Sequence, residues 1–382
     1  MNTHLQEHIV WRFKREFDTD PILVKAPGRI NLIGEHTDYN EGFVFPAAID
    51  RCIIAAVQKS KSDICCAIAD DANEQFNFSL HEIRPFAKGT WKNYIVGVVA
   101  ELQKIGANIT PFNLVFAGDI PIGAGLSSSA ALENSLVFAL NALFNLKLSR
   151  KEMIFVSQNA EHNYAKVRCG IMDMYASMFA KENSALFLDC RTLESTDYEL
   201  DLGDYQLVLI NTNVKHQLSE SAYNHRRLLC EKAAVLMNKP ALRDAHEEDL
   251  KKINAELSAA DYQKILYVIQ ENRRVKEAVQ SIVEKDLIGL GKLMYKTHYG
   301  LQKQYKVSCE ELDYLVNQCK QTKEVIGARM MGGGFGGCTL NIVAKPALKS
   351  FSEKIAIDYK NRFNSACSIY SVELSGGTHL LS

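Results

Sequence analysis

The stretch "PIGAGLSSSAALE" combines residue types that could hold phosphate. Gly123 and Gly125 can adopt positive φ angles and leave room for a ligand. Ser127 is placed to cap an apolar helix, whose first amides and positive dipole end form an anion site. The hydroxyls of Ser128 and Ser129 could bind phosphate oxygens or a magnesium ion, although an ordinary helix cap after a glycine turn is the alternative. Because the stretch lacks the lysine of the common phosphate loop, the balancing positive charge must come from elsewhere.

A second stretch, "APGRINLIGEHTDYNEGFVFPAA", crowds four polar side chains among glycines and apolar residues: Arg29, Glu35, His36 and Asp38. Their spacing matches neither a helix face nor an alternating strand, so it predicts a loop that presents hydrogen-bonding groups. The carboxylates of Glu35 and Asp38 can accept hydrogen bonds from hydroxyls, as sugar recognition requires. A surface turn with a satisfied ion pair is the alternative.

A third stretch, "RMMGGGFGGC", has five glycines in six positions. Without Cβ atoms, the backbone there can approach another group closely. The surrounding sequence, "GARMMGGGFGGCTLNIVA", predicts a loop between two strands. A merely flexible loop is the alternative, but such a loop would usually be more polar.

Strands and helices must position these stretches. Short strands are predicted at "ILVKA", "CIIAAVQ", "ICCAIA", "QFNFSL", "FNLVFAG", "ALFLDC" and "YQLVLINTN", with "SIYSVEL" as the final strand. Helices are predicted over residues 6–17, 91–105, 127–143, 150–162 and 347–362. A long helical region over about 219–320 carries alternating charges, which indicate solvated helix faces. Strands and helices that mix without strict alternation predict an α+β fold in layers.

The domain organisation is inferred from chain length and from a change in the predicted secondary structure along the sequence. A chain of 382 residues suggests two domains. Near residue 200 the short strands give way to the charged helical region, so domains are expected over residues 1–200 and 201–382. No low-complexity linker marks this boundary.

Charge and cysteine usage exclude several classes of protein. The 44 basic and 45 acidic side chains give a net charge of −1, which argues against a nucleic-acid or acidic-membrane partner. No run approaches the roughly 18 apolar residues that span a membrane, and the charged N-terminus does not resemble a signal peptide. The ten scattered cysteines include no C-x-x-C pair and predict free thiols in a reducing cytoplasm.

Together the motifs resemble the GHMP small-molecule kinases, and the first 50 residues narrow the likeness to the galactokinase family. "GRINLIGEHTDY" resembles the galactokinase signature almost residue for residue, and "PIGAGLSSSAALE" resembles the phosphate motif. "CGIMD" resembles the segment that bears the catalytic aspartate, and "GARMMGGGFGGCTL" resembles the C-terminal glycine motif. "GKLMYKTHYGLQKQYKVSCEELDYLV" also fits the galactokinase pattern, so the likeness covers nearly the whole chain.

The resemblance implies a two-domain GHMP kinase fold, with an N-terminal mixed sheet covered by helices and a ferredoxin-like C-terminal domain. The site would lie between the domains. The implied reaction is ATP-dependent phosphorylation of α-D-galactose at its anomeric hydroxyl to galactose 1-phosphate, the first committed step of galactose metabolism. The implied partners are galactose, ATP and Mg²⁺, bound by a cytoplasmic monomer.

The resemblance also implies two catalytic residues. Asp173 would lie beside the anomeric hydroxyl and take its proton or orient it for attack on the γ-phosphate. Arg29 would lie close by, favour the charged aspartate and neutralise charge on the transferred phosphoryl group. Arg29 would thereby supply the positive charge that the phosphate stretch lacks.

By the same resemblance, the sugar hydroxyls would be held by Glu35, His36, Asp38, Gly170 and Tyr223. Asp38 is the best candidate to contact the C4 hydroxyl, on which discrimination against glucose depends. A site built to bond one hydroxyl can reject a mismatched one by roughly 10⁴-fold, because buried polar groups are then left unpaired.

The nucleotide side follows in the same way. The resemblance implies that the triphosphate is cradled by Gly123, Gly125, Ser127 and Ser128, and that magnesium is held by Ser129 and Glu161. Trp91 would contact adenine, with a core tryptophan as the alternative. The glycine loop 332–337 would close over the substrates from the second domain.

Four positions depart from the galactokinase pattern. Met174 stands for a usual Gln, Lys166 for Gly, Arg168 for Asn or Pro, and Met331 for Thr. These departures leave the reaction class intact and concern fine specificity and turnover.

Two other functions are open. One is an N-acetylgalactosamine kinase of the same subfamily, which would need room at the C2 position of the sugar. The other is a non-catalytic sensor of galactose and ATP built on this fold. The intact run of residues 127–131, together with Asp173 and Arg29, favours a working enzyme.

Overall fold

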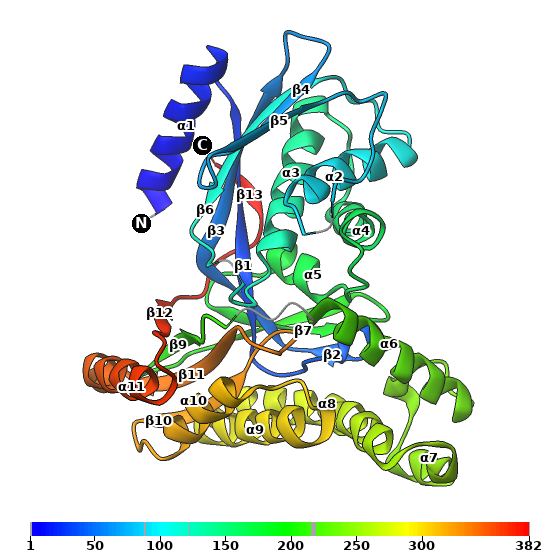
Figure 1. Cartoon of the computed structure of the whole chain (residues 1–382), viewed down its shortest axis with the longest axis vertical. Coiled ribbons are helices and arrows are strands. Elements are labelled where there is room, and N and C mark those ends of the chain that lie inside the picture. The colour runs from blue at the N-terminus through cyan, green and yellow to red at the C-terminus, as the bar shows by residue number, and fades with distance from the viewer. Residues whose placement is uncertain (1, 88, 122, 215–218, 382) are drawn as a thin grey trace.

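The structure is a computed structural model and describes residues 2–87, 89–121, 123–214 and 219–381. Its N-terminal part is built on a six-stranded mixed sheet of order β13-β1-β3-β6-β4-β5 (Figure 1). The strands are β1 (Ile22–Asn31), β3 (Pro46–Lys59), β4 (Cys65–Ala69), β5 (Glu74–Phe78), β6 (Phe112–Gly118) and β13 (His379–Leu381). β4 runs parallel to β6, whereas the other neighbouring pairs are antiparallel.

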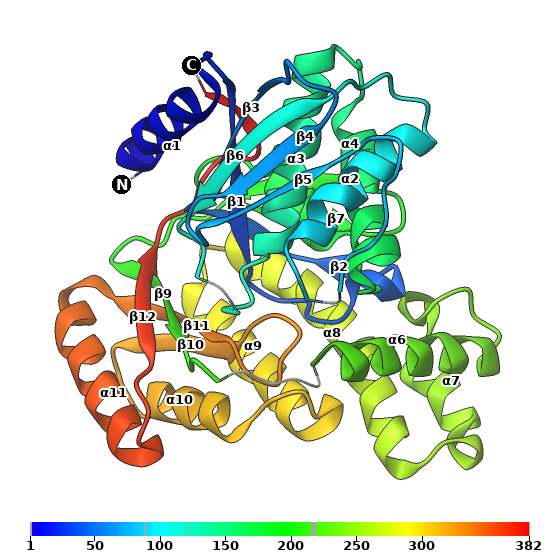
Figure 2. The same ribbon diagram turned by 45° about the horizontal axis from the view of Figure 1, so that its top comes forward.

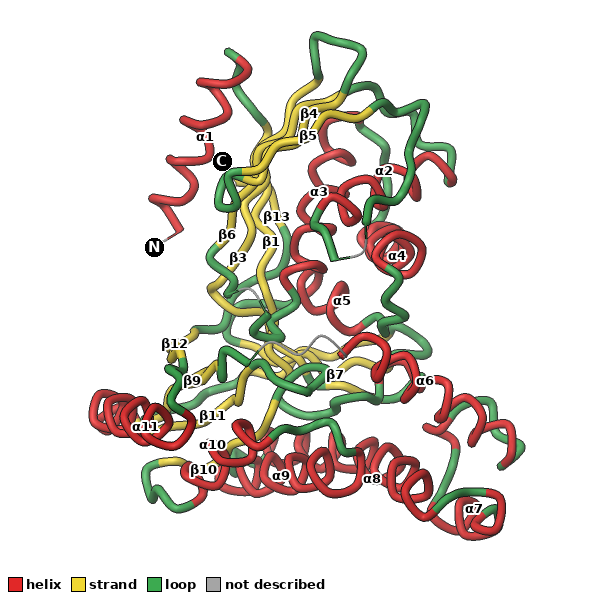
Figure 3. The backbone as a smooth tube through the Cα atoms, viewed as in Figure 1, coloured by secondary structure: helices red, strands yellow, loops and turns green. Residues whose placement is uncertain are grey.

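Helices cover both faces of this sheet, α1 (Asn2–Phe17) on one face and four helices on the other (Figure 3). The four are α2 (Lys92–Lys104), α3 (Ser128–Phe144), α4 (Arg150–Ala160) and α5 (Met172–Phe179). Successive side chains of a strand point to opposite faces. In β3, Ile53 and Ala55 therefore join the main core beneath α3, whereas Cys52 and Ile54 join the smaller core beneath α1. Burial on both faces explains why residues 52–57 of this strand are an unbroken apolar run.

The second sheet has four antiparallel strands in the order β10-β11-β9-β12. These are β9 (Tyr205–Asn211), β10 (Val325–Met330), β11 (Cys338–Ala344) and β12 (Ser368–Val372), with α11 (Leu348–Phe363) between the last two. Helices also connect β9 to β10, so the chain follows a β-α-β-β-α-β path. The expected ferredoxin-like arrangement is confirmed, and so is the α+β class.

The predicted helical region between β9 and β10 is also confirmed. Figure 2 shows these helices below and beside the second sheet. They are α6 (Ser219–Leu236), α7 (Glu247–Lys252), α8 (Ala259–Val283), α9 (Leu287–Tyr299) and α10 (Glu310–Lys320). A third, three-stranded sheet of β2 (Phe43–Val44), β7 (Ser184–Asp189) and β8 (Glu194–Glu199) lies at the base of the first.

The C-terminal segment corrects one prediction. "SIYSVEL" contains β12 but is not the final strand, because β13 follows and pairs with β1. β13 has three residues, too few for an alternating pattern to be recognised in sequence. The last strand thus returns to the N-terminal sheet. The domain boundary near residue 200 stays a prediction.

Candidate active site

Arg29 and Asp173 form the centre of the site. Arg29 lies in β1, and its Nε and NH2 donate to the two carboxylate oxygens of Asp173 at 2.9 and 3.0 Å. Asp173 is held in the first turn of α5. Burial alone would lower the pKa of the Arg29 guanidinium, but the charges of Asp173 and Glu35 outweigh it and raise that pKa. The pair therefore carries a fixed positive charge beside a carboxylate.

The position of Arg29 corrects the expectation of a continuous loop over residues 26–48. β1 continues through Arg29 to Asn31, and Arg29 pairs with Ala48 of β3. The pairing register shifts between Pro27 and Arg29. This bulge breaks the alternation, which is why the sequence pattern did not indicate a strand.

Ser127 corrects a second expectation. It precedes α3 with φ of 60°, and its side chain does not cap the helix. Instead its hydroxyl donates to Asp173 Oδ2 at 2.6 Å. The left-handed backbone turns the side chain away from the helix amides and toward the carboxylate. Ser127 therefore belongs to the Asp173 cluster, and Ser128 is the first residue of the helix.

The glycines of the phosphate stretch have the expected backbone. Gly123 and Gly125 have φ angles of 72° and 73°, in the left-handed region that favours glycine. Arg29 NH1 donates to the carbonyl oxygen of Gly125 at 2.6 Å, so one guanidinium joins this loop to Asp173. Ile122, in the same stretch, lies outside the described residues.

The C-terminal glycine loop lies directly on the phosphate stretch. It connects β10 to β11, which confirms a loop between strands. A Cβ built on Gly332 would lie 3.4 Å from the Cα of Gly125, and one on Gly337 would lie 3.5 Å from the carbonyl oxygen of Ala124. The two loops therefore meet backbone to backbone, and the positive φ angles of Gly332 and Gly337, 81° and 82°, favour glycine at both positions.

Glu35 and His36 follow β1 and are both buried. Glu35 Oε1 accepts from Arg329 NH2 at 2.5 Å and from the Gly332 amide at 2.8 Å. Burial would raise the pKa of Glu35, but Arg329 and then Arg29 outweigh it and lower that pKa. Burial lowers the pKa of His36 to about 4, so this ring is neutral near pH 7. Its Nδ1 lies 2.8 Å from the hydroxyl of Tyr39.

Asp38 and Gly170 are in direct contact. A Cβ built on Gly170 would lie 1.9 Å from Asp38 Oδ2, so glycine is required for this approach. Burial, followed by the charge of Asp173, raises the pKa of Asp38 to about 7. Tyr223, from α6, completes this corner, with its ring 5.5 Å from that of His36.

One cavity of ≈ 200 Å³ gathers most of the predicted residues: Arg29, Glu35, His36, Asp38, Ser129, Glu161, Asp173 and Tyr223. They come from β1 and the turn after it, from α3, α5 and α6, and from the π-helical turn η2 (Glu161–Ala165) that continues α4. Gly332 and Gly333 of the glycine loop also line this cavity. The fold thus brings together residues from all three sequence stretches.

Ser129 and Glu161 fit a divalent cation. Both line the cavity, and Glu133 lies one helical turn after Ser129. Both carboxylate oxygens of Glu133 are buried without a hydrogen-bond partner among the described residues. Burial and then the charge of Glu161 raise the pKa of Glu133 well above its usual range. Among the described residues no three His, Cys, Asp or Glu side chains form a metal-binding group, but Mg²⁺ needs few protein ligands when phosphate supplies the rest.

Trp91 packs in the N-terminal part. Its ring lies 5.2 Å from those of Phe76 and Phe116, and its Nε1 donates to Glu74 at 3.1 Å. These contacts pack the partly buried ring against the main core. A contact with adenine stays a prediction.

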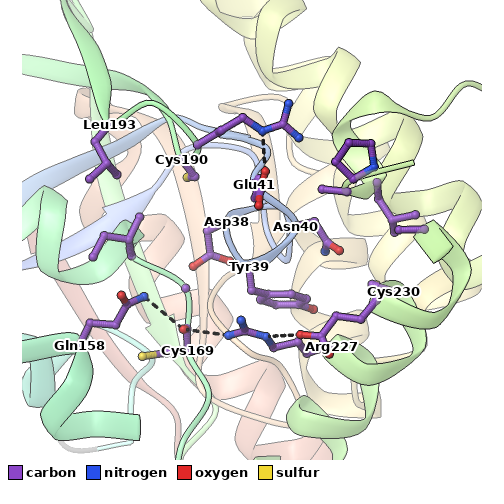
Figure 4. Close-up of a pocket in the computed structure, with 18 of the residues that line it drawn as sticks. Asp38, Tyr39, Asn40, Glu41, Gln158, Cys169, Cys190, Leu193, Arg227 and Cys230 are labelled. Atoms are coloured by element: carbon purple, nitrogen blue, oxygen red, sulfur yellow. Dashed lines mark hydrogen bonds and ion pairs between the residues drawn. The ribbon is translucent and has the colours of Figure 1, made fainter. Parts of the chain in front are cut away.

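A second cavity, of ≈ 310 Å³, is also lined by Asp38 (Figure 4). Asp38 and Cys169 line both cavities. The carbonyl oxygen of Cys169 accepts from Gln158 and Arg227, each at 3.4 Å, and lies 2.9 Å from His162 Nε2. These contacts fix the segment that leads to Gly170 and Asp173.

The four departures lie at different depths. Lys166 and Arg168 are exposed, and Arg168 lies 3.7 Å from Glu231. Met174 and Met331 are buried, and Met331 Sδ accepts from the Asn31 amide at 3.4 Å. The buried pair therefore belongs to the packing behind the site, whereas the basic pair faces solvent.

Sequence reasoning missed Arg329. It lies within the C-terminal glycine motif, where the glycines alone indicated a function. A charged residue between apolar neighbours at the end of a buried strand was the signal, because such a charge needs a partner. Arg329 is fully buried, and that partner is Glu35.

Three family models match this chain. A "Galactokinase galactose-binding signature" matches residues 12–59, "GHMP kinases N terminal domain" matches 93–181, and "GHMP kinases C terminal" matches 276–361. A galactokinase of Thermosipho africanus is 40% identical over 93% of this chain and 98% of its own length. A galactokinase of Clostridium beijerinckii is 39% identical over 92% of this chain and 93% of its own.

Solved structures show the same fold. The crystal structure of Lactococcus lactis galactokinase complexed with galactose has a TM-score of 0.94 and 31% identity, covering 98% of this chain and 100% of that one. A mevalonate kinase of Methanococcus jannaschii has a TM-score of 0.64 at 18% identity, covering 94% of this chain and 99% of its own. The second likeness concerns the fold alone.

Proposed function

The chain belongs to the galactokinase family of the GHMP kinases and phosphorylates galactose, and we propose that the transfer takes place in the cavity beside Asp173. The phosphoryl donor is ATP, as the family implies. The observation that carries the proposal is the pairing of Asp173 with Arg29 at the point where the sugar-signature segment and the phosphate stretch meet.

Asp173 is proposed to take the proton of the anomeric hydroxyl or to orient that hydroxyl for attack. Three donors hold its carboxylate: Arg29 through two nitrogens, and the hydroxyl of Ser127. The third guanidinium nitrogen holds Gly125. Arg29 therefore places a positive charge between Asp173 and the phosphate stretch. There it would stabilise the negative charge that develops on the phosphoryl group during transfer.

The sugar hydroxyls are proposed to contact Glu35, His36, Asp38, Gly170 and Tyr223. All five line one or both of the two cavities that share Asp38, and the neutral ring of His36 can donate or accept. Asp38 remains the proposed contact for the C4 hydroxyl. Gly170 supports it by leaving the carboxylate the space that any side chain would take.

The triphosphate is proposed to lie along Gly123, Gly125, Ser127 and Ser128, at the start of α3. Because the hydroxyl of Ser127 is bonded to Asp173, its contribution there would come from its backbone. Ser129 and Glu161 are proposed to hold Mg²⁺, which neutralises phosphate charge when bound. The buried carboxyl of Glu133 lies one helical turn after Ser129, and its raised pKa favours the neutral form there.

We also propose that the enzyme acts as a monomer in the cytoplasm, on galactose and ATP and without nucleic acid. The balanced charge supports the absence of nucleic acid. The cysteines are all free thiols, as a reducing compartment favours. Within the described part of the chain, every helix is too short or too polar to cross a bilayer.

An ADP-release assay over a panel of hexoses tests the proposal. Galactose is expected to stimulate release, with glucose and N-acetylgalactosamine far weaker, and Asp173→Ala is expected to abolish it. Preference for N-acetylgalactosamine would move the assignment to the related kinase. Unchanged activity in the Asp173→Ala variant would remove Asp173 from the mechanism.

A further inference from the structure

We propose that Arg329 is a positioning residue for the phosphoryl transfer. It holds Glu35 charged and oriented, so that Arg29 remains paired with Asp173. The inference rests on the proposed function of this site. Arg329 stands at the end of β10, in the second sheet, whereas Glu35 and Arg29 belong to β1 and the turn after it. It therefore connects the two parts of the fold at the site.

The contacts of Arg329 are one-sided. Its NH2 donates to Glu35 Oε1 at 2.5 Å and to the carbonyl oxygen of Asn31 at 2.6 Å. Its Nε and NH1 are buried without a partner among the described residues. The desolvation cost of a buried ion pair often equals the free energy gained from its attraction. Because two nitrogens of Arg329 lack partners among the described residues, this pair is expected to add little to the stability of the fold. Its effect on Glu35 is the better explanation.

Glu35 is fixed from two directions. The oxygen that accepts from Arg329 also accepts from the amide of Gly332, at 2.8 Å. Gly332 in turn lies against Gly125, where a Cβ on either glycine would be 3.4 Å from the other loop. The carboxylate of Glu35 thus joins the sugar side of the cavity to the loop that rests on the phosphate stretch.

The charges alternate in a row: Arg329, Glu35, Arg29 and Asp173. Both guanidinium groups lower the pKa of Glu35 against the effect of burial, and Arg329 contributes more. The titratable and charged groups that face Glu35 are Arg329, Arg29, His36, Asp38 and Tyr267. Of these, Arg29 is the cation that would remain if Arg329 were neutral. It would then be shared between Glu35 and Asp173, and the geometry at Asp173 would loosen.

Three substitutions separate this role from packing. Arg329→Lys keeps the charge, Arg329→Met keeps much of the volume, and Arg329→Gln keeps polarity without charge. Matched controls are Arg12→Lys and Arg12→Met on α1, where a largely buried arginine pairs with Asp70 and Glu16 on the far face of the sheet. Each variant is compared with wild type in thermal unfolding and in kcat and kcat/KM for galactose and ATP from pH 5 to 9.

The proposal predicts a drop of about tenfold or more in kcat for Arg329→Met and Arg329→Gln, with Arg329→Lys clearly more active than either. Without the cation, the acidic limb of the kcat/KM profile should move to higher pH, because Glu35 then protonates more readily. The Arg12 variants should retain wild-type activity and profiles. Wild-type kcat and an unmoved limb in Arg329→Met would overturn the proposal, as would equal losses in all three variants that follow their melting temperatures.

If the neutral variants do not fold, Glu35 provides the test. Arg329→Lys is made alone and on a Glu35→Gln background. In the second case the carboxylate with which residue 329 pairs is absent. The lysine substitution should lower kcat in the first case and add nothing in the second. Equal losses on both backgrounds would overturn the proposal. An inactive wild-type enzyme would instead refute the proposed function, so the two failures are distinguishable.

Discussion

Arg29 and Asp173 lie 144 residues apart in the chain and meet through two parallel hydrogen bonds of 2.9 and 3.0 Å. The same guanidinium reaches the carbonyl oxygen of Gly125 with its remaining nitrogen. Three separate segments therefore share one cation. In the proposed mechanism this arrangement supplies the positive charge that the phosphate stretch lacks, and the shape of Arg29 then matters as much as its charge.

Arg29→Lys tests that shape. A lysine keeps the charge but cannot bond both oxygens of Asp173 and the Gly125 carbonyl with a planar fork. We expect kcat to fall by about 100-fold, with a smaller change in KM for galactose. Steady-state ADP release measures both constants, with Arg12→Lys as the control. Activity within twofold of wild type would show that charge alone suffices.

Gly170→Ala tests the contact with Asp38. The added Cβ would fall 1.9 Å from Asp38 Oδ2, so the carboxylate must move. We expect KM for galactose to rise by about tenfold, because the displaced carboxylate of Asp38 no longer meets the sugar hydroxyl at hydrogen-bonding distance. Gly376→Ala is the matched control, since its Cβ would lie at an ordinary 3.4 Å from the Glu182 side chain. An unchanged KM in Gly170→Ala would separate Asp38 from sugar binding.

Asp38 should make stability depend on pH. Its pKa is raised from 3.8 to about 7 in the folded protein, so the protonated carboxyl favours folding. That contribution is complete below about pH 4 and is lost as the pH rises through about 7. Because Asp38 is partly exposed to the cavities, we expect a loss of about 1–3 kcal/mol. Asp38→Asn should lack this part of the loss in urea unfolding at pH 5 and 8, whereas equal pH dependence in both proteins would contradict it.

Glu161→Gln tests the metal assignment. With the single carboxylate of the proposed pair replaced by a neutral amide, the Mg²⁺ concentration for half-maximal activity should rise by about tenfold. Binding of Mn²⁺ in the presence of ADP, followed by electron paramagnetic resonance, should weaken to a similar degree without any turnover. Glu7→Gln on the exposed side of α1 should change neither quantity. Unaltered Mn²⁺ binding in Glu161→Gln would remove Glu161 from the metal site.

The sequence alone indicated the α+β class through its mix of strands and helices, and it indicated the reaction through its resemblance to the galactokinase family. The glycine stretches and the sugar signature are local patterns. Such patterns can be recognised in the sequence without knowledge of the tertiary structure. The loop between β10 and β11 was predicted from such a pattern, the ferredoxin-like path was implied by the resemblance to the GHMP kinases, and both are confirmed. The strand at Arg29 and the short β13 were missed, because a bulge and a three-residue length hide the alternation on which strand prediction depends.

Only the tertiary structure decided which partners the side chains of the site bind. Ser127 has the right residue type and position for a helix cap, yet a left-handed backbone turns it to Asp173. Glu35 looked like a free sugar ligand, but its carboxylate is already bonded to Arg329, nearly 300 residues away. Partnerships of this kind depend on how distant segments pack and on how burial makes each charge require a partner, and neither is written in local spacing.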